Sequence, residues 1–282
     1  MFVIIGIAVV LGSVVGGYVL EHGNLNLLFQ PVELLIIGGA AVGAFFISSP
    51  LKVLGIVSKN IVRVLSARGT SKKEFLEILG VLNGIFTKMR KEGLIAIEAD
   101  IETPDQSPLF TKYPSILKNH HAVSFICDNL KVIISANVTP FELENIMDLE
   151  LDSHHHEAMI PSHSITKVAD GLPALGIVAA VLGVVLTMAK ISEPPEVLGH
   201  SIGAALVGTF LGVLLSYGFV GPIGTHLEHI AEEDMVIFQV IKIALVSFVG
   251  GAAPQIAVEY ARRVIPSGVK PGFTELEEAM RK

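Results

Sequence analysis

Cysteine and charged residues are both scarce in this chain of 282 residues. Charged side chains make up 17% of the sequence and hydrophobic ones 51%, which is low in charge for a soluble domain but ordinary for a small membrane protein. The single cysteine, Cys127, excludes an internal disulfide and any metal site built from several cysteines. A formal net charge of −7 argues against nucleic acid as the main partner, because nucleic-acid-binding proteins carry basic patches.

The usual signatures of catalysis and metal binding are also missing. The sequence has no glycine-rich phosphate loop and no pair of cysteines separated by two residues. His154–His156, with His163 nearby, could bind a metal, but successive residues on a helix point about 100° apart and cannot all reach one ion. We therefore interpret these histidines as solvent-exposed surface and expect no metal, no cofactor and no enzymatic activity. Cys127 lies in an apolar helical pattern, which favours a buried small residue over a reactive thiol.

Four apolar runs are each long enough to cross the bilayer core as a helix. They are residues 1–20, 32–49, 172–189 and 197–219. The first run lacks a basic leading segment and a small-residue cleavage site, so we interpret it as a retained helix rather than a signal peptide. Pro31 is well placed to begin the second helix, and Pro50 ends it. A fifth stretch, Met235–Val249, is short and contains Gln239 and Lys242, so we do not count it as a span.

Small residues recur at helical spacing in the third and fourth runs, which a short polar turn joins into a hairpin. In lipid, small residues let helix backbones approach closely. The packing positions that we predict in this hairpin are Gly176, Gly183, Gly208 and Gly212. The first run has a similar predicted packing surface at Gly12, Gly16 and Gly17.

The four runs contain no Asp, Glu, Lys or Arg away from their ends, and Glu33 lies at the edge of the second run. Ionisable groups within a membrane mark ion and proton pathways. If the protein moves ions, we therefore expect a partner chain to supply the carboxylate. The spans do contain hydroxyl groups, among them Thr187 and Thr209, although such a hydroxyl more often bonds back to its own helix than lines a pore.

Residues 51–169 carry charges again, and helical patterns dominate there. The clearest is Lys72–Glu92, whose apolar side chains recur every three or four residues at Phe75, Leu79, Leu82, Phe86 and Met89. Ala122–Ser135 is a further helix candidate. Thr139–Glu142 resembles a capped helix start, and we expect that helix to end near Met159, ahead of Pro161.

Basic residues are distributed unevenly along the chain. Of the 20 Lys and Arg, only Lys190 falls in the short turns between spans, and the other 19 lie in residues 51–169 or after residue 221. The positive-inside rule therefore places both termini and residues 51–169 in the cytoplasm. Pro173 would open the third helix and Pro222 close the fourth at the same depth, where a proline either sets a kink or simply ends a helix.

The predicted fold is an all-α integral membrane protein with four transmembrane helices and a large helical cytoplasmic domain. We expect a first transmembrane hairpin at residues 1–49, a cytoplasmic helical domain at 50–169, a second transmembrane hairpin lining the ion path at 170–221, and a cytoplasmic helical tail at 222–282.

Two stretches of the second hairpin resemble the third and fourth helices of the MotA family, the flagellar stator subunits within the MotA/TolQ/ExbB proton-channel superfamily. They are Asp170–Gly183, which contains Pro173, and Val207–Gly212. The similarity also covers Gly16-Gly17-Tyr18 and Gln30–Leu34 in the first hairpin and Pro254–Glu259 in the tail, so it extends over essentially the whole chain in the same order.

The resemblance implies a subunit that forms, with a second subunit MotB, a proton-conducting complex of the bacterial inner membrane and converts ion flow into torque on the rotor. Family members are expected to surround a MotB dimer as a homo-oligomer, a pentamer, with MotB supplying the membrane aspartate. By position, Arg90 and Glu98 match charges that face the rotor protein FliG. Pro173 and Pro222 match the family's two essential prolines, and we assign them to the ion path with two further residues, Ala180 and Thr209.

The resemblance also implies a coupling ion. Sodium-type members are expected to carry a threonine at the position of Ala180, beside a threonine of the fourth helix, and here only Thr209 is present. We therefore expect proton coupling. Two alternatives are an ion-driven transducer of the ExbB or TolQ kind, which usually has three spans, and a membrane-embedded enzyme that uses the histidines.

Overall fold

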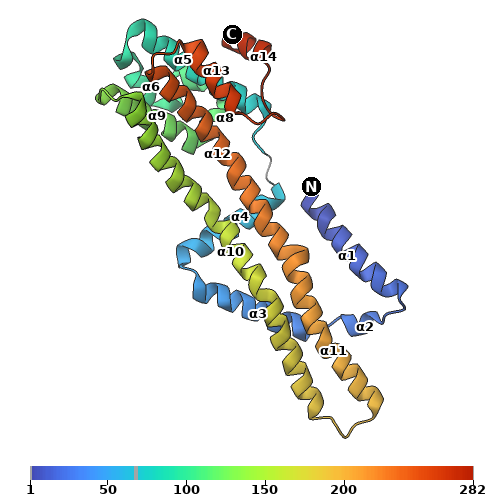
Figure 1. The fold of residues 1–282 in the computed structure, drawn as a ribbon. Helices are drawn as coiled ribbons and strands as arrows, with labels where there is room; N and C mark the ends of the chain where they lie inside the picture. The colour runs from blue at the N-terminus through green and yellow to red at the C-terminus, as the bar shows by residue number, and fades with distance from the viewer. Residues whose placement is uncertain (1, 67–68, 282) are drawn as a thin grey trace. The chain divides into compact units, whose positions relative to one another are not determined.

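The computed structural model describes residues 2–66 and 69–281, and every regular element within these ranges is a helix (Figure 1). The chain forms two compact units. Met1–Ala67 and Ala158–His229 make up the first unit, and Arg68–Glu157 and Ile230–Lys282 make up the second.

The first unit holds the apolar helices. It contains α1 (Phe2–Leu20), α2 (Leu25–Leu28), α3 (Pro31–Ser48), α4 (Leu51–Ser66), the C-terminal part of α10 (Pro140–Met188), α11 (Pro195–Val213), the π-helical η3 (Leu214–Val220) and the first turns of α12 (Gly221–Val249). Among the described residues, four helical stretches are long and apolar enough to cross a membrane. They are Phe2–Leu20, Leu25–Ser48, Pro140–Met188 and Pro195–Val249, so the all-α fold with four predicted spans is confirmed.

The second unit is built from shorter helices and the remaining parts of α10 and α12. Its own elements are α5 (Lys72–Glu92), η1 (Leu94–Ile97), α6 (Glu98–Glu102), η2 (Pro104–Gln106), α7 (Pro108–Thr111), α8 (Pro114–Leu117), α9 (His120–Ser135), α13 (Pro254–Val264) and α14 (Phe273–Arg281). The apolar end of α12 belongs to this unit, where Val240, Ile241, Ala244 and Leu245 are fully buried. The hydrophobicity of Met235–Val249 therefore serves a core.

The α5 helix supplies much of that core. The five apolar residues predicted to share one face are all buried, each at most 2% exposed. A capping box begins the helix: the Ser71 hydroxyl accepts the Glu74 N–H at 3.3 Å, and the Glu74 carboxylate accepts the Ser71 N–H at 2.6 Å. Phe86 stacks on Phe248 of α12 with ring centroids 4.4 Å apart. The predicted Lys72–Glu92 helix is confirmed, and so is the Ala122–Ser135 helix, which begins two residues earlier.

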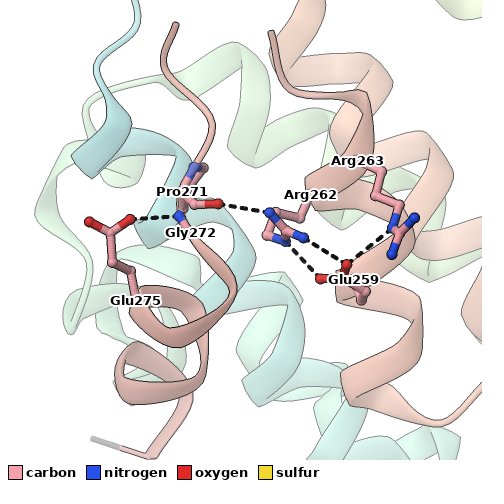
Figure 2. Close-up of polar contacts among 6 residues, drawn as sticks. All are labelled: Glu259, Arg262, Arg263, Pro271, Gly272 and Glu275. Carbon is pink, nitrogen blue, oxygen red and sulfur yellow. Dashed lines mark hydrogen bonds and ion pairs between the residues drawn. The ribbon is translucent and has the colours of Figure 1, made fainter. Parts of the chain in front are cut away.

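Arg262 joins α13 to the segment that precedes α14 (Figure 2). Arg262 donates two hydrogen bonds to Glu259, at 2.7 and 2.8 Å, and the next arginine donates a third at 3.1 Å. Arg262 also donates to the carbonyl oxygen of Pro271 at 2.9 Å, and the Gly272 N–H donates to Glu275 at 2.6 Å. These bonds tie the C-terminal segment to α13.

The helix that begins at Pro140 does not end near Met159, so that prediction is wrong. Its capped start is present, with the Thr139 N–H donating to Glu142 at 2.8 Å, but the helix passes through Pro161 and Pro173 to Met188. A proline in a helix interior removes one backbone hydrogen bond, at a cost of about 3 kcal/mol. In the apolar surroundings of Pro173 an interrupted helix would leave several backbone groups unpaired, so the continuous helix with one lost bond is favoured. Next to Pro161 the helix packs against α12, where the buried Ser162 hydroxyl donates to the Gly224 carbonyl at 2.9 Å.

Pro222 does not close the fourth helix either. The chain passes from α11 through η3 into α12. Pro222 has no N–H to bond the carbonyl four residues earlier, and its ring crowds that carbonyl. The backbone widens instead, and the Gly221 N–H donates to the carbonyl oxygen of Ser216, five residues back. The π-helical turn η3 is the consequence of this proline.

Candidate functional site

The α10 and α11 helices cross in backbone contact. A Cβ placed on Gly176 would lie 2.8 Å from the carbonyl oxygen of Gly208 and 2.9 Å from the Cα of Gly212. A Cβ placed on Gly212 would lie 2.7 Å from the carbonyl oxygen of Leu172 and 2.8 Å from the Cα of Gly176. No side chain fits at either position, so the crossing depends on glycine on both helices.

The four predicted packing glycines all lie along this contact, because Gly183 also faces Ala205, 2.6 Å from where its Cβ would be. The surface predicted for α1 behaves differently. A Cβ on Gly12, Gly16 or Gly17 would meet nothing within 4 Å, so these glycines pack against no part of the described chain.

Ala180 and Thr209 lie at the level of the same crossing. A Cβ on Gly208 would be 3.1 Å from the backbone nitrogen of Ala180, which is 9% exposed, and Thr209 follows Gly208 on α11. The structure therefore places Ala180 against the residue before Thr209 on the facing helix. Thr187, one turn beyond Gly183 on α10, donates its hydroxyl hydrogen to the Gly183 carbonyl at 2.8 Å, as expected for a hydroxyl that bonds its own helix.

Glu33, in the first turn of α3, extends its side chain into this hairpin. Its Oε2 lies 3.0 Å from the Cβ position of Gly208 on α11, and its Oε1 lies 3.6 Å from that of Gly183 on α10. The side chain is 9% exposed, and Oε2 is buried with no hydrogen-bond partner in the described residues. Glu33 was expected only at the edge of the second run, and the structure adds that its carboxyl group is buried within the hairpin. Glu33 is at the end of α3 in sequence, but its carboxyl group lies between α10 and α11.

The two prolines fall where the same two helical segments meet. Pro173 leaves the carbonyl of Ala169 without its helical donor. A Cβ on Gly221, the residue before Pro222, would lie 3.9 Å from the Ala169 side chain. Each neighbouring segment thus lacks one regular hydrogen bond at this level, which makes both segments easier to bend.

Arg90 and Glu98 are both exposed on the second unit. Arg90, at the end of α5, donates to the carbonyl oxygen of Ala252 at 3.4 Å, and Glu98 begins α6. A partly buried contact joins α5 and α6, because Lys88 donates to Asp100 at 2.7 Å. The side chains of Arg90 and Glu98 are therefore both on the surface of the second unit.

The histidine run is partly inside the second unit. His155 and His156 are exposed, as predicted, but His154 is half-buried and packs edge-on against Phe238 at 4.5 Å. Burial lowers the pKa of His154, and the nearby His121 lowers it further. Among the described residues no group of three or more His, Cys, Asp or Glu could hold a metal ion. Cys127 is buried, and burial raises its pKa to about 11, so it is not a reactive thiol.

Two family models match the chain. The model for the motility protein A N-terminal region matches residues 4–93, and that for the MotA/TolQ/ExbB proton channel family matches residues 118–239. Motility protein A of Salmonella typhimurium is 43% identical over 281 residues, which cover 100% of this chain and 95% of that protein. Motility protein A of Escherichia coli is 41% identical with the same coverage. Chemotaxis protein LafT of Vibrio parahaemolyticus is 31% identical, over 97% of this chain and 96% of that protein.

Two solved structures share the fold. The MotAB structure from C. jejuni matches with a TM-score of 0.76 and 19% identity, over 94% of this chain and 95% of that one. The flagellar MotAB stator complex from Bacillus subtilis matches with a TM-score of 0.71 and 24% identity, over 94% of this chain and 96% of that one.

Proposed function

The chain belongs to the motility protein A branch of the MotA/TolQ/ExbB proton channel family, and from this we propose that it is a stator subunit of the bacterial flagellar motor. With MotB it forms a proton-conducting complex that converts ion flow into torque. The observation that carries the proposal is the full-length match at 43% identity, together with four helical stretches apolar enough to span a membrane.

The crossing of α10 and α11 supports this role. Glycine-to-glycine contacts between Gly176, Gly208 and Gly212 leave no interlocked side chains to resist small shifts of one helix along the other. A unit charge that crosses the membrane potential yields about 2.3 kcal/mol per 100 mV. That energy is enough to bias two helix arrangements of similar free energy, and the weakened turns at Pro173 and Pro222 are where such a shift would bend the helices.

The proposed complex is a pentamer of this chain around a MotB dimer in the bacterial inner membrane, with both termini in the cytoplasm. The basic residues support this orientation, because only Lys190 lies in the turns between spans. A reporter fused after the C-terminal residue should give a cytoplasmic signal, and one inserted at residues 192–196 a periplasmic signal. A periplasmic signal from the C-terminus would overturn the topology.

Deletion of the gene tests the function itself. Cells without this chain should assemble flagella that do not rotate, and a plasmid copy should restore rotation. Paralysed cells without filaments, or cells that swim normally, would contradict the proposal. An ExbB-like transducer predicts normal swimming with impaired energy-dependent transport at the outer membrane, so the same strain separates the two functions.

The exposed charges on α5 and α6 are the proposed contact with the rotor protein FliG. Arg90→Glu or Glu98→Lys should impair swimming while membrane levels of the protein stay normal. Lys131→Glu is a matched reversal, since Lys131 is exposed on α9 and its ion pair with Asp128 is exposed as well. A swimming defect from the control as large as that from Arg90→Glu would point to a general charge effect and against a specific contact.

We further propose that the coupling ion is a proton. Position 180 is alanine, so Thr209 supplies one side-chain hydroxyl where sodium-type members are expected to have two, and a dehydrated metal cation needs several oxygen ligands. Swimming speed should collapse with a protonophore and be indifferent to external sodium. Speed that follows sodium concentration at constant pH would refute proton coupling.

A further inference from the structure

Glu33 has a buried, titratable side chain to which the proposed function has so far given no role. Its carboxyl group is held between α10 and α11, with Oε2 3.0 Å from the Cβ position of Gly208 and Oε1 3.6 Å from that of Gly183. Glycine at position 208 is what leaves room for it, since the 3.6 Å separation from the Gly183 position is an ordinary van der Waals contact. A Cβ on Gly208 would press at once on Oε2, on the Ala180 nitrogen at 3.1 Å and on the Ala179 methyl at 3.2 Å.

No cation of this chain is available to neutralise the group within the hairpin. Between Leu172 and Val213 the only titratable or charged residues are Lys190, Glu193, Glu196 and His200, all in or near the turn. Lys190 follows Gly183 by seven residues, which is about 10 Å along a helix. The short helix α2, which contacts α11, carries no charge, and α3 has no other titratable residue.

The carboxyl group is also beside the path candidates. The Gly208 position that Oε2 faces is next to Thr209 in sequence and 3.1 Å from the Ala180 nitrogen. An unpaired ionised carboxylate is costly in apolar surroundings, so this group needs either a proton or a charged partner from outside the chain. In a complex that conducts protons, a buried carboxyl with one free oxygen is suited to accept and release them.

We propose that Glu33 is a proton-binding residue of the ion path, an inference that rests on the proposed function. The carboxylate takes up a proton from the side of the α10–α11 turn, forming an O–H bond on the buried Oε2. That bond breaks when the proton passes, through water, to a carboxylate on the membrane helix of the partner subunit. No electrons change hands, and each cycle returns Glu33 to its starting form.

The test compares two glutamates that hold the same place in a helix. Glu33 and Glu196 each lie in the first turn, of α3 and α11 respectively, but Glu196 is exposed. Glu33→Gln and Glu196→Gln both remove one first-turn charge and keep the side-chain shape. Each variant is co-expressed with the partner subunit, checked for assembly, and measured for proton flux in vesicles and for swimming speed across a range of external pH.

Glu33→Gln should assemble normally and lower proton flux by about a hundredfold, the low end of what a positioned proton-transfer group contributes. Glu33→Asp should restore part of the flux with a shifted pH profile, and Glu196→Gln should match the wild type. Flux through Glu33→Gln equal to that of the wild type, with the same pH profile, would overturn the inference and leave the proposed function intact. A wild-type complex that conducts no protons would overturn both.

A second measurement needs no variant. Hydrophobic carbodiimides react with protonated carboxyl groups, so the wild-type complex is treated across neutral to mildly acidic pH and the peptide that contains Glu33 is analysed by mass spectrometry. Labelling of Glu33 that rises with acidity and accompanies loss of flux would support the proposal even if Glu33→Gln failed to assemble. A Glu33 that stays unlabelled while flux is lost would refute it.

Discussion

Substitution of alanine for Gly212 should separate α10 from α11. The new Cβ would lie 2.7 Å from the carbonyl oxygen of Leu172 and 2.8 Å from the Cα of Gly176. Both contacts are with backbone atoms, which cannot rotate away as the end of a flexible side chain can. Carbon atoms pack best at about 3.5–4.0 Å, so the two backbones must move apart by roughly 1 Å.

The size of the effect follows from a matched glycine on the same helix. A Cβ on Gly199 would meet nothing within 4 Å. Both Gly199→Ala and Gly212→Ala gain helix propensity of about 1 kcal/mol, and this gain cancels when the variants are compared. The remaining difference is the cost of overpacking, about 1–3 kcal/mol, or roughly 5- to 150-fold in the equilibrium between assembled and dissociated forms.

The assay is the temperature at which the detergent-solubilised complex with its partner subunit loses its assembled peak in size-exclusion chromatography. Gly212→Ala should dissociate at a lower temperature than Gly199→Ala, and Gly199→Ala should equal or exceed the wild type. Equal dissociation temperatures for the two variants would refute the argument that the crossing has no room for a methyl group.

Three further predictions concern the second unit. Hydrogen bonds from Arg262 and Arg263 hold the pKa of Glu259 below its usual value of 4.5. These bonds therefore stabilise the fold above that pH, and the stabilisation is lost as the pH falls through the pKa of the folded state. Acidification from about pH 5 to pH 3 should lower the melting temperature of the wild type, measured by circular dichroism, more than that of Glu259→Gln. Cys127, buried and with a pKa of about 11, should react with a maleimide far more slowly at neutral pH than after denaturation, and rapid labelling of the native protein would contradict this. Asp100→Ala removes the hydrogen-bond acceptor of Lys88 and of the buried Ser107 hydroxyl, so it should lower the free energy of unfolding in urea titrations by about 1.5–3 kcal/mol. Asp128→Ala removes an exposed ion pair and should lower it by under about 1 kcal/mol.

Local patterns in the sequence predicted the helices of the second unit well. The buried face of α5 and its capping box both involve residues three or four positions apart. The apolar repeat from Phe75 to Met89 is therefore enough to identify the buried face. The proline rule failed at Pro173 because it describes helices in water, where a broken turn can bond to solvent. Pro173 lies in the apolar run 172–189, where a break is more costly than one missing bond. At Pro161 the helix instead packs against α12, where the buried Ser162 hydroxyl donates to the Gly224 carbonyl at 2.9 Å.

The candidate site was less predictable because it depends on long-range packing. The small residues of the hairpin could be read from their spacing, but the spacing does not say which of them face each other. Gly176 of α10 packs against Gly212 of α11, while a Cβ on Gly199, also on α11, would have no atom within 4 Å. The place of Glu33 could not be found from local sequence at all, since Gly183 and Gly208, which face its carboxyl group, follow it by 150 and 175 positions.

The distance in sequence between Glu33 and the two helices that enclose it has a consequence for how the protein enters the membrane. Gly183 follows Glu33 by 150 residues, and at roughly 5–20 residues per second the ribosome makes the enclosing hairpin about 8–30 seconds after it makes Glu33. During that interval α3 has inserted without a cavity for its acid. Its position in the first turn lets the charged group remain among the lipid headgroups until α10 and α11 arrive. Glu33 therefore lies at the membrane surface while α3 inserts and becomes an interior residue once α10 and α11 are in place. An acid one or two turns further along α3 would lie in the apolar core of the membrane during insertion, at a higher free-energy cost.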